Sequence, residues 1–479
     1  PGWQYWNKDP KFGELVHQNT REMIRRDRNH PSVLMWEPIL NETRYPLDFA
    51  LKALEITKEE YPYPGRPVAA ADVHSAGVKE HYDVVYGWPG DDEKEDKPEQ
   101  CIFTREFGEN VDDWYAHNNN NRASRSWGER PLLVQAMSLA KSYDEMYRTT
   151  GLFIGGAQWH PFDHQRGYHP DPFYGGLMDV FRQPKYSYYM FKAQRSPRKE
   201  ERLFETGPVV YIAHEMTPFS GKDVTVYSNC DEVRLTFLKD GKTYTYNKPV
   251  VKEGMPSPVI TFSDVYDFMV DKAMSRKKKQ DEVLLRAEGL IDGKVVATHE
   301  VHPARRPEKV LLWVDNENVN LKADGSDFVT VVAAIADKNG NIKRLNNYYV
   351  KFHVEGEGRI LGDAGILANP APVKWGTAPV LIQSTLKPGK IKVTASVLFE
   401  GSQMPVSAVL ELESYPAAHP LVYSEKDASL IAGSSSLQSA GTSAKSAVEL
   451  EQERILKVQN AQRLKEVEQQ QEDFGEKNK

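Results

Sequence analysis

Cysteine is scarce in this sequence: only Cys101 and Cys230 occur in 479 residues. Two cysteines so far apart exclude a disulfide framework and a Cys-x-x-Cys metal site. Long apolar runs are also absent, so no segment is predicted to cross a membrane as a helix. A basic excess is lacking as well, because the formal net charge is −7. We therefore expect neither a membrane nor a nucleic acid as a partner.

Aromatic residues, in contrast, are abundant. The chain has nine Trp and 23 Tyr within a composition of 40% hydrophobic and 27% charged residues, which is ordinary for soluble globular proteins. Aromatic faces suit sugar rings as well as cores, and a core position is the favoured interpretation for any single aromatic residue. The length exceeds what one hydrophobic core supports and predicts about three or four domains.

The first residues are typical of the end of a strand and not of a protein start. The chain begins with Pro1, and residues 2–6 read Gly-Trp-Gln-Tyr-Trp. No signal-like segment precedes them in this sequence. We therefore expect that the N-terminal portion of the protein is missing from it.

Strand-like and helix-like segments alternate over the first part of the chain. Helical periodicity predicts helices over 9–28, 47–60, 129–149 and 185–194. Short apolar runs predict strands over 33–36, 66–71, 82–86, 101–108 and 151–159. This alternation indicates a parallel sheet, and about five strands stand where a closed barrel has eight. We expect residues 1–200 to be the C-terminal portion of a (β/α)₈ TIM barrel.

All-β patterns follow the barrel segment. Alternating runs and Asp-Gly or Asn-Gly turn signals predict two blocks of about a hundred residues each, a size typical of immunoglobulin-like β-sandwich domains. The predicted domains cover 206–304 and 307–414, and Arg305-Arg306-Pro307 is the expected linker. The tail, 415–479, contains a Ser- and Gly-rich flexible segment and then a charged segment with helical spacing. A solvated tail is favoured there over a docking helix.

Two glutamates stand at the predicted carboxyl ends of different barrel strands, Glu42 and Glu106. Hydrolysis of a glycosidic bond needs such a pair, with one carboxyl group protonated and the other ionised on the opposite side of the anomeric carbon. Either glutamate alone would be interpreted as an ordinary surface or loop residue. The presence of both at strand ends favours a catalytic role. Glu37 lies five residues before Glu42, so we expect it deeper and rank it below Glu42.

Four segments, in order along the chain, resemble glycoside hydrolase family 2, which comprises β-galactosidases, β-glucuronidases and β-mannosidases. Residues 28–42, Arg-Asn-His-Pro-Ser-Val-Leu-Met-Trp-Glu-Pro-Ile-Leu-Asn-Glu, resemble the strand-four motif and are the most specific match. The others are Tyr86-Gly87-Trp88 for strand six, residues 104–108 (Thr-Arg-Glu-Phe-Gly) for strand seven, and residues 156–159 (Gly-Ala-Gln-Trp) for strand eight. The two sandwich domains also fit this resemblance.

The resemblance implies roles for these residues. Glu106 would be the nucleophile, kept ionised by donors such as Tyr86 and Arg105. Glu42 would protonate the glycosidic oxygen and then activate water. Asn41 would bind the sugar 2-hydroxyl group, a contact that tightens in the transition state.

The remaining substrate-binding residues that the resemblance implies are Trp88, Trp159 and Asp163. Trp159 would stack on the sugar face. Neither a metal nor another cofactor is expected, because His160, His164 and His169 lie in a loop interrupted by Pro and Gly; hydrogen bonds to substrate or backbone are the favoured interpretation for them.

Departures from the family pattern bear on specificity. The family's N-terminal domains and early barrel strands are absent from this sequence. The loop after Glu106, which contains Trp114, His117 and Asn118–Asn121, does not show the Asn-x-Lys carboxylate clamp of β-glucuronidases. The expected substrate is therefore a neutral sugar, a terminal β-D-galactoside, in a retaining double displacement. β-Mannosidase or β-glucuronidase specificity stays open, as does an inactive barrel fragment whose sandwich modules bind carbohydrate. A secreted or periplasmic location is expected, and a homo-oligomer is left open.

Overall fold

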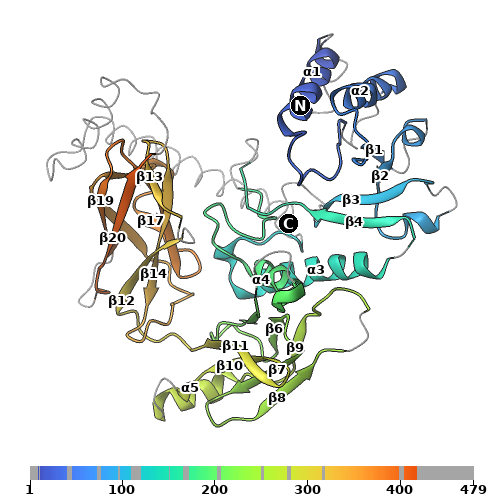
Figure 1. Ribbon diagram of the computed structural model, residues 1–479. Coiled ribbons are helices and arrows are strands. Elements are labelled where there is room, and N and C mark those ends of the chain that lie inside the picture. Colours follow the sequence, from blue (N-terminus) through green and yellow to red (C-terminus); the bar gives the residue numbers. More distant parts are fainter. Residues whose placement is uncertain are drawn as a thin grey trace, which may run out of the picture. The chain divides into compact units, whose positions relative to one another are not determined.

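The computed structural model describes residues 9, 11–39, 46–72, 77–94, 98–108, 120–149, 151–165, 172–201, 207–249, 253–277, 282–315, 319–398 and 404–417. The predicted site residues Asn41 and Glu42, His169, and nearly all of the predicted tail lie outside these residues. The chain divides into two compact units, Pro1–Pro303 and Ala304–Lys479 (Figure 1). Each unit is described by itself, and the predicted domain boundaries stay predictions.

A parallel sheet of four strands forms the first part of unit 1 (Figure 1). Its strands are β1 (Ala69–Asp72), β2 (Val84–Tyr86), β3 (Cys101–Phe107) and β4 (Phe153–Gln158), hydrogen-bonded in that order. The parallel strands predicted here are therefore confirmed. The strand predicted over 33–36 is wrong in extent: only Trp36 pairs, in a parallel bridge to Val68. Pro38, two residues later, has no N–H to extend a ladder beyond this bridge.

Two helices cover the first strands of this sheet. Helix α1 (Phe12–Asp27) and helix α2 (Leu47–Glu60) pack around the buried Trp36 ring. Arg25 Nε and Nη2 donate hydrogen bonds to the two oxygens of the Glu60 carboxylate, each at 2.8 Å. Arg28 donates to the Glu60 backbone carbonyl at 3.0 Å, so the arginine that opens the strand-four motif joins the two helices.

Helices α3 (Glu129–Arg148) and α4 (Tyr186–Lys192) follow β3 and β4, respectively. The face that α3 buries consists of residues spaced three or four apart along the helix; they are Leu132, Ala136, Leu139, Ala140 and Met146. Met137, which belongs to the apolar face predicted for this helix, is 40% exposed.

Short 3₁₀ helices span Lys79–His81, Asp91–Glu93, Arg125–Trp127, Lys199–Glu201 and Ala364–Ile366.

The remainder of unit 1 is a pair of antiparallel sheets that pack around one apolar core. One sheet contains β5 (Val210–Ala213), β6 (Val224–Ser228) and β9 (Ile260–Phe262); the other contains β7 (Glu232–Phe237), β8 (Thr243–Asn247), β10 (Leu285–Ile291) and β11 (Lys294–Val301). Helix α5 spans Phe268–Lys277. The hairpin predicted at the Asp-Gly signal is confirmed as β7–β8.

The sandwich rests on the helices of the parallel sheet. The Tyr189 ring of α4 stacks on Tyr211 of β5 with centroids 3.6 Å apart. Gln194 and Ser257 exchange two hydrogen bonds, of 2.9 and 3.0 Å, through the glutamine amide and the serine backbone. The parallel and antiparallel parts of unit 1 thus contact each other directly.

Unit 2 is a second antiparallel sandwich. One sheet contains β12 (Lys309–Asp315), β14 (Phe328–Ala336), β18 (Thr377–Ser384) and β16 (Gly358–Ile360); the other contains β13 (Leu321–Ala323), β20 (Ala408–Pro416), β19 (Gly389–Leu398), β15 (Tyr349–Gly356) and β17 (Ala371–Pro372). Strands β13 and β20 pair in parallel. Alternate residues of both sheets meet in one core of Val, Ile, Ala and Phe side chains.

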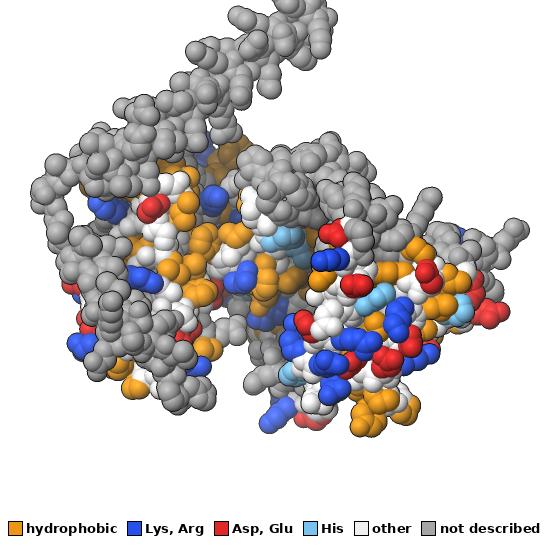
Figure 2. Space-filling view, turned by 90° about the horizontal axis from the view of Figure 1, so that it is seen from above, with side chains coloured by type: hydrophobic (Ala, Val, Ile, Leu, Met, Phe, Trp, Pro, Cys, Tyr) orange, Lys and Arg blue, Asp and Glu red, His pale blue; other side chains and the backbone are white. Residues whose placement is uncertain are grey.

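The surface of the described residues carries both signs of charge. In the view of Figure 2, acidic and basic side chains alternate on the described face and do not gather into one basic area. Among the described residues, the structure contains no helix with the length and apolar character needed to cross a membrane.

Candidate active site

Three of the predicted site residues lie at the carboxyl edge of the parallel sheet. Tyr86 is the last residue of β2, Glu106 is next to last in β3, and Trp159 follows β4. The Trp159 N–H donates to the Phe107 carbonyl at 2.9 Å, which places Trp159 beside the end of β3. Because parallel strands end at one edge, these three residues lie at the same edge of the sheet.

The segment that leads to Glu42 approaches the same edge. The Trp36 N–H donates to Pro67 at 3.0 Å and its carbonyl accepts from Ala69 at 2.7 Å, so Trp36 runs parallel to β1. Ile39, three residues on, is buried. Asn41 and Glu42 follow outside the described residues, and their roles stay predictions.

Arg105 is the central cation of this edge. Its guanidinium carbon lies 4.6 Å from the centroid of the Tyr86 ring, and it forms an ion pair with Glu37. Its side chain is only 9% exposed. Desolvation lowers the pKa of Arg105 to about 10, although the negative charge of Glu106 raises it. The pKa still lies well above 7, so a fixed positive charge stands beside Glu106 at neutral pH.

Trp88 offers an aromatic surface at this edge. Its side chain is 44% exposed and lies edge-on to the Tyr86 ring, with centroids 6.2 Å apart. The turn that carries it is held by the Trp88 N–H, which donates to Asp91 at 2.7 Å, and by the hydroxyl of the buried Thr104, which donates to the Gly87 carbonyl at 2.5 Å. The exposed indole is therefore well placed to contact a ligand.

Trp159 belongs to a cluster of rings. The centroids of His160, Phe173 and His164 lie 4.3, 5.1 and 5.5 Å from its own. The two histidines face each other through Nδ1 atoms 3.2 Å apart, and His160 Nδ1 also lies 2.5 Å from the Phe162 carbonyl. These contacts fix the indole plane, which is the requirement for stacking on a sugar ring.

Asp163 lies inside the fold. It is 4% exposed, and its carboxylate accepts from Lys185 Nζ at 2.6 Å and from the Gly176 N–H at 2.9 Å. Burial raises the pKa of Asp163 to about 6, against the opposing effect of Lys185. A Cβ on Gly176 would come within 2.2 Å of the Asp163 nitrogen, so only glycine fits. The described contacts of Asp163 are internal, and its contact with a sugar stays a prediction.

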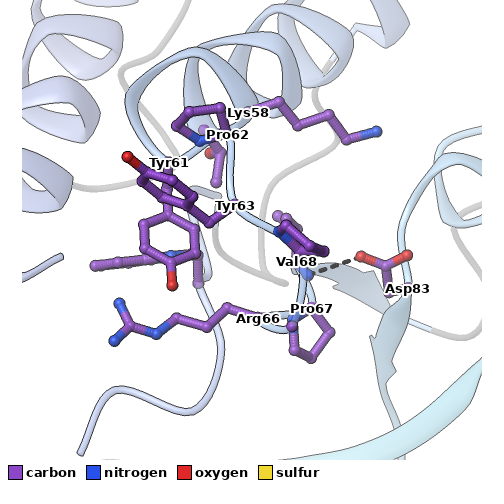
Figure 3. A pocket seen from close by; sticks show the side chains of 12 residues that line it. Lys58, Tyr61, Pro62, Tyr63, Arg66, Pro67, Val68 and Asp83 are labelled. Carbon is purple, nitrogen blue, oxygen red and sulfur yellow. Dashed lines mark hydrogen bonds between the residues drawn. The ribbon is translucent and has the colours of Figure 1, made fainter. Parts of the chain in front are cut away.

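A separate cavity of about 710 Å³ lies at the opposite edge of the sheet (Figure 3). Its walls come from residues that precede β1 and β2, including Tyr61, Tyr63, Arg66 and Asp83. The Arg66 guanidinium stacks on Tyr61 at 4.6 Å, and Asp83 accepts from the Val68 N–H at 2.9 Å. In parallel barrels this edge serves stability, and chemistry belongs to the other. We therefore do not place the active site in this cavity.

No metal centre is formed by the described residues: none of their His, Cys, Asp and Glu side chains gather in groups of three or more that could hold an ion. The sequence did not indicate three of the contacts at or near the rim. These are the Glu37–Arg105 pair, the Asp163–Lys185 pair, and the Arg122 guanidinium over the Phe173 ring at 3.7 Å.

Comparison with known families accounts for this arrangement. Residues 1–148 match the model of the glycosyl hydrolases family 2 TIM barrel domain, and residues 312–398 match the glycoside hydrolase family 2 C-terminal domain 5. These two matches show that the chain is similar to glycoside hydrolase family 2. The predicted resemblance is thus confirmed, together with a TIM-barrel domain at its start and a β domain near its end.

Curated relatives of the chain include the β-galactosidase of Thermoanaerobacter pseudethanolicus (strain ATCC 33223 / 39E). It is 29% identical over 423 residues, which are 85% of this chain and 52% of that protein. The β-galactosidase of Thermoanaerobacterium thermosulfurigenes is 25% identical over 375 residues, 76% of this chain and 50% of that protein. The chain thus spans about half the length of these curated relatives.

A solved family 2 structure, a β-glucuronidase, superposes with a TM-score of 0.59 at 19% identity. The match covers 86% of this chain and 42% of that one. At this identity the likeness concerns the fold alone. It agrees with the order of elements described above, a parallel sheet with helices followed by β-sandwiches.

Proposed function

We propose that the protein to which this chain belongs is a retaining glycosidase that cleaves terminal β-D-galactosides. The observation that carries the proposal is the convergence of Glu106, Arg105 and Tyr86 at the carboxyl edge of the parallel sheet. A carboxylate beside a fixed cation stays ionised at neutral pH, and an ionised carboxylate is what a nucleophile at the anomeric carbon requires.

The reaction proceeds in two displacements. In the first, Glu106 attacks the anomeric carbon while Glu42 donates its proton to the departing glycosidic oxygen, and a covalent glycosyl-enzyme forms. In the second, Glu42 takes a proton from water, the water oxygen attacks the same carbon, and the bond to Glu106 breaks. Both carboxyl groups return to their starting protonation states, and the sugar leaves with its original configuration.

The other rim residues bind and orient the sugar. Asn41 binds the 2-hydroxyl group, a contact that gains strength as positive charge develops on the ring. The Trp159 indole, fixed by its contacts with His160 and Phe173, stacks on the apolar face of the sugar. The exposed Trp88 ring contacts the part of the substrate beyond the cleaved bond.

Galactose is the proposed sugar for two reasons. The two curated relatives described above are β-galactosidases, and the loop directly after Glu106 has no Asn-x-Lys clamp for a sugar carboxylate. A β-glucuronidase among the solved structures of the same fold makes β-glucuronides the principal comparison substrates. We also propose a secreted or periplasmic location, which cell fractionation followed by immunodetection tests.

The test uses the complete protein and a panel of aryl β-glycosides that includes the galactoside, mannoside and glucuronide. We expect the highest kcat/KM on the galactoside and its loss in Glu106→Gln and in Glu42→Ala. Azide is expected to restore turnover of the Glu42 variant only, because a small nucleophile replaces water that lacks its base. Glu80→Gln, at an exposed residue before β2, is the matched control. Unchanged turnover in either catalytic variant would refute the mechanism.

A further inference from the structure

Glu37 and Arg105 form an ion pair at the rim, the carboxyl edge of the parallel sheet. The proposed reaction does not use this pair. Glu37 directly follows Trp36, and Arg105 directly precedes Glu106, so the pair joins the two segments that carry the proposed catalytic residues. The two side chains are 28% and 9% exposed. Burial of a charged side chain is costly, and an ion partner offsets that cost. The pair therefore holds Arg105 in its place.

The Arg105 guanidinium still has donor capacity toward the site. One of its Nη atoms contacts Glu37, and its plane lies over the Tyr86 ring. Its Nε and second Nη atoms are buried and have no hydrogen-bond acceptor among the described residues. Glu106 is close enough for its charge to raise the pKa of Arg105. The cation thus contacts Glu37 and is also influenced by the charge of Glu106, its neighbour in β3 and the proposed nucleophile.

We propose that Glu37 competes with Glu106 for the Arg105 cation, so that the Glu37–Arg105 pair sets the pH below which the nucleophile loses its charge. The inference rests on the proposed function, because it takes Glu106 as the nucleophile. Because Arg105 attracts both carboxylates, Glu37 weakens the effect of the Arg105 charge on Glu106. Glu106 therefore stays ionised at neutral pH without being bound so tightly that its attack on carbon is suppressed.

The pair also has a consequence for the class of substrate. Glu37 cancels the charge of Arg105, and the negative charge of Glu106 remains as the net charge of the group. Such a site favours a neutral sugar, whose ring becomes positively charged in the transition state, and disfavours a sugar that carries a carboxylate. The argument for a neutral substrate therefore has a structural basis that is independent of the missing Asn-x-Lys clamp.

Other titratable groups face this cluster from the neighbouring elements. Tyr86 comes from β2, and its ring is occupied by Arg105. His160 follows β4, and its Nδ1 is held by the Phe162 carbonyl. Glu42 lies outside the described residues. Because none of these groups changes in the variants proposed below, each variant alters one charge of the pair against a constant background.

The experiment measures kcat/KM on an aryl β-galactoside against pH in Arg105→Met and Glu37→Gln. The acid limb of this profile reports the ionisation of the nucleophile in the free enzyme. Removal of the cation raises the pKa of Glu106, so in Arg105→Met we expect the limb to move up by about 1–2 pH units. Removal of the competing anion lowers that pKa, so in Glu37→Gln we expect the limb to move down by about 1 pH unit.

Three further variants sharpen the test. Arg105→Lys keeps the charge but loses the planar fork, so its limb should return most of the way to the wild-type position. In the double variant Glu37→Gln/Arg105→Met the two opposed shifts should largely cancel. Glu80→Gln should leave the limb unmoved. If Arg105→Met fails to fold by circular dichroism, Glu37→Gln and Arg105→Lys decide the question. Shifts in the same direction in the two single variants, or unmoved limbs, would overturn the inference.

A second readout separates this inference from the proposed function. An activated 2-deoxy-2-fluoro galactoside labels the nucleophile of a retaining enzyme, and mass spectrometry identifies the labelled residue. Labelling of Glu106 in the wild type with unmoved acid limbs in the variants would refute only the role of the pair. Labelling of another residue, or none together with no turnover of any panel substrate, would refute the proposed function and the inference with it.

Discussion

Glu129 gives a sharp prediction for the pH dependence of stability. It is the first residue of α3, is 8% exposed, and accepts hydrogen bonds from the Ser220 hydroxyl at 2.5 Å and from the Glu215 N–H at 3.3 Å. Glu129 therefore joins the helix to the sandwich within unit 1. Desolvation raises its pKa to about 7, although the Ser220 bond opposes this, and the negative charge of Glu215 adds to the rise. The perturbation is Glu129→Gln, which keeps an acceptor for both bonds and removes the charge.

The sign and size of the effect follow from the raised pKa. Between the ordinary glutamate value of 4.5 and about 7, the folded state binds more protons at this group than the unfolded state does. The free energy of unfolding therefore falls as the pH rises through this window, by at most about 3 kcal/mol. The α3 dipole stabilises a charge at this end by about 0.3–1 kcal/mol, which reduces the effect. For Glu129→Gln we expect a stability gain of about 1–3 kcal/mol at pH 8 relative to pH 4.5.

Urea unfolding followed by tryptophan fluorescence measures this difference at pH 4.5, 6 and 8. Glu14→Gln is the matched control, since Glu14 lies in the first turn of α1 and is exposed; it should change stability by less than about 0.5 kcal/mol at every pH. If Glu129→Gln lowers the free energy of unfolding by the same amount at pH 8 as at pH 4.5, the Glu129 charge does not destabilise the folded state. The reasoning would then be wrong.

Three other changes probe the rim and its support. Lys185→Met leaves the Asp163 carboxylate buried without its cation, and we expect a loss of about 3–5 kcal/mol in urea unfolding at pH 7; a loss below about 1 kcal/mol would contradict the ion pair. Tyr86→Phe keeps the ring under Arg105 and removes a donor near Glu106, so steady-state kinetics on an aryl galactoside should show kcat about 10-fold lower with thermal stability unchanged. Trp159→Ala removes the stacking surface and should raise KM more than it lowers kcat; an unchanged KM would refute the stacking role.

Much of the parallel sheet could be predicted from the sequence because its strands are short apolar runs bounded by turn residues. Strand β3 occupies 101–107, one residue shorter than the predicted 101–108, and its alternating buried residues are Ile102 and Thr104. The proposed location of the site follows from one general property of parallel sheets, that their strands end at one edge. The strand predicted over 33–36 was too long, because the apolar run begins at Val33 but only Trp36 pairs with a neighbouring strand residue.

The electrostatic partners at the rim could not be predicted in the same way. An ion pair between Glu37 and Arg105 depends on which residues of two non-adjacent strand ends face each other, and β3 has an irregular register between Thr104 and Phe107. Asp163 illustrates the same limit. Its place after strand eight indicated a substrate contact, but its buried partner, Lys185, lies 22 positions along the chain, and no local pattern joins the two.

The cavity beside Tyr63 has a practical consequence for handling the protein. Tyr63 is 70% exposed and lies at the edge of the sheet opposite the rim, so a surface or a dye coupled there would leave the entrance for substrate unobstructed. Tyr63→Cys would provide the attachment point, since Cys230 is buried and Cys101 is half-buried in β3. Immobilisation through this position would orient every molecule with its rim toward the solution.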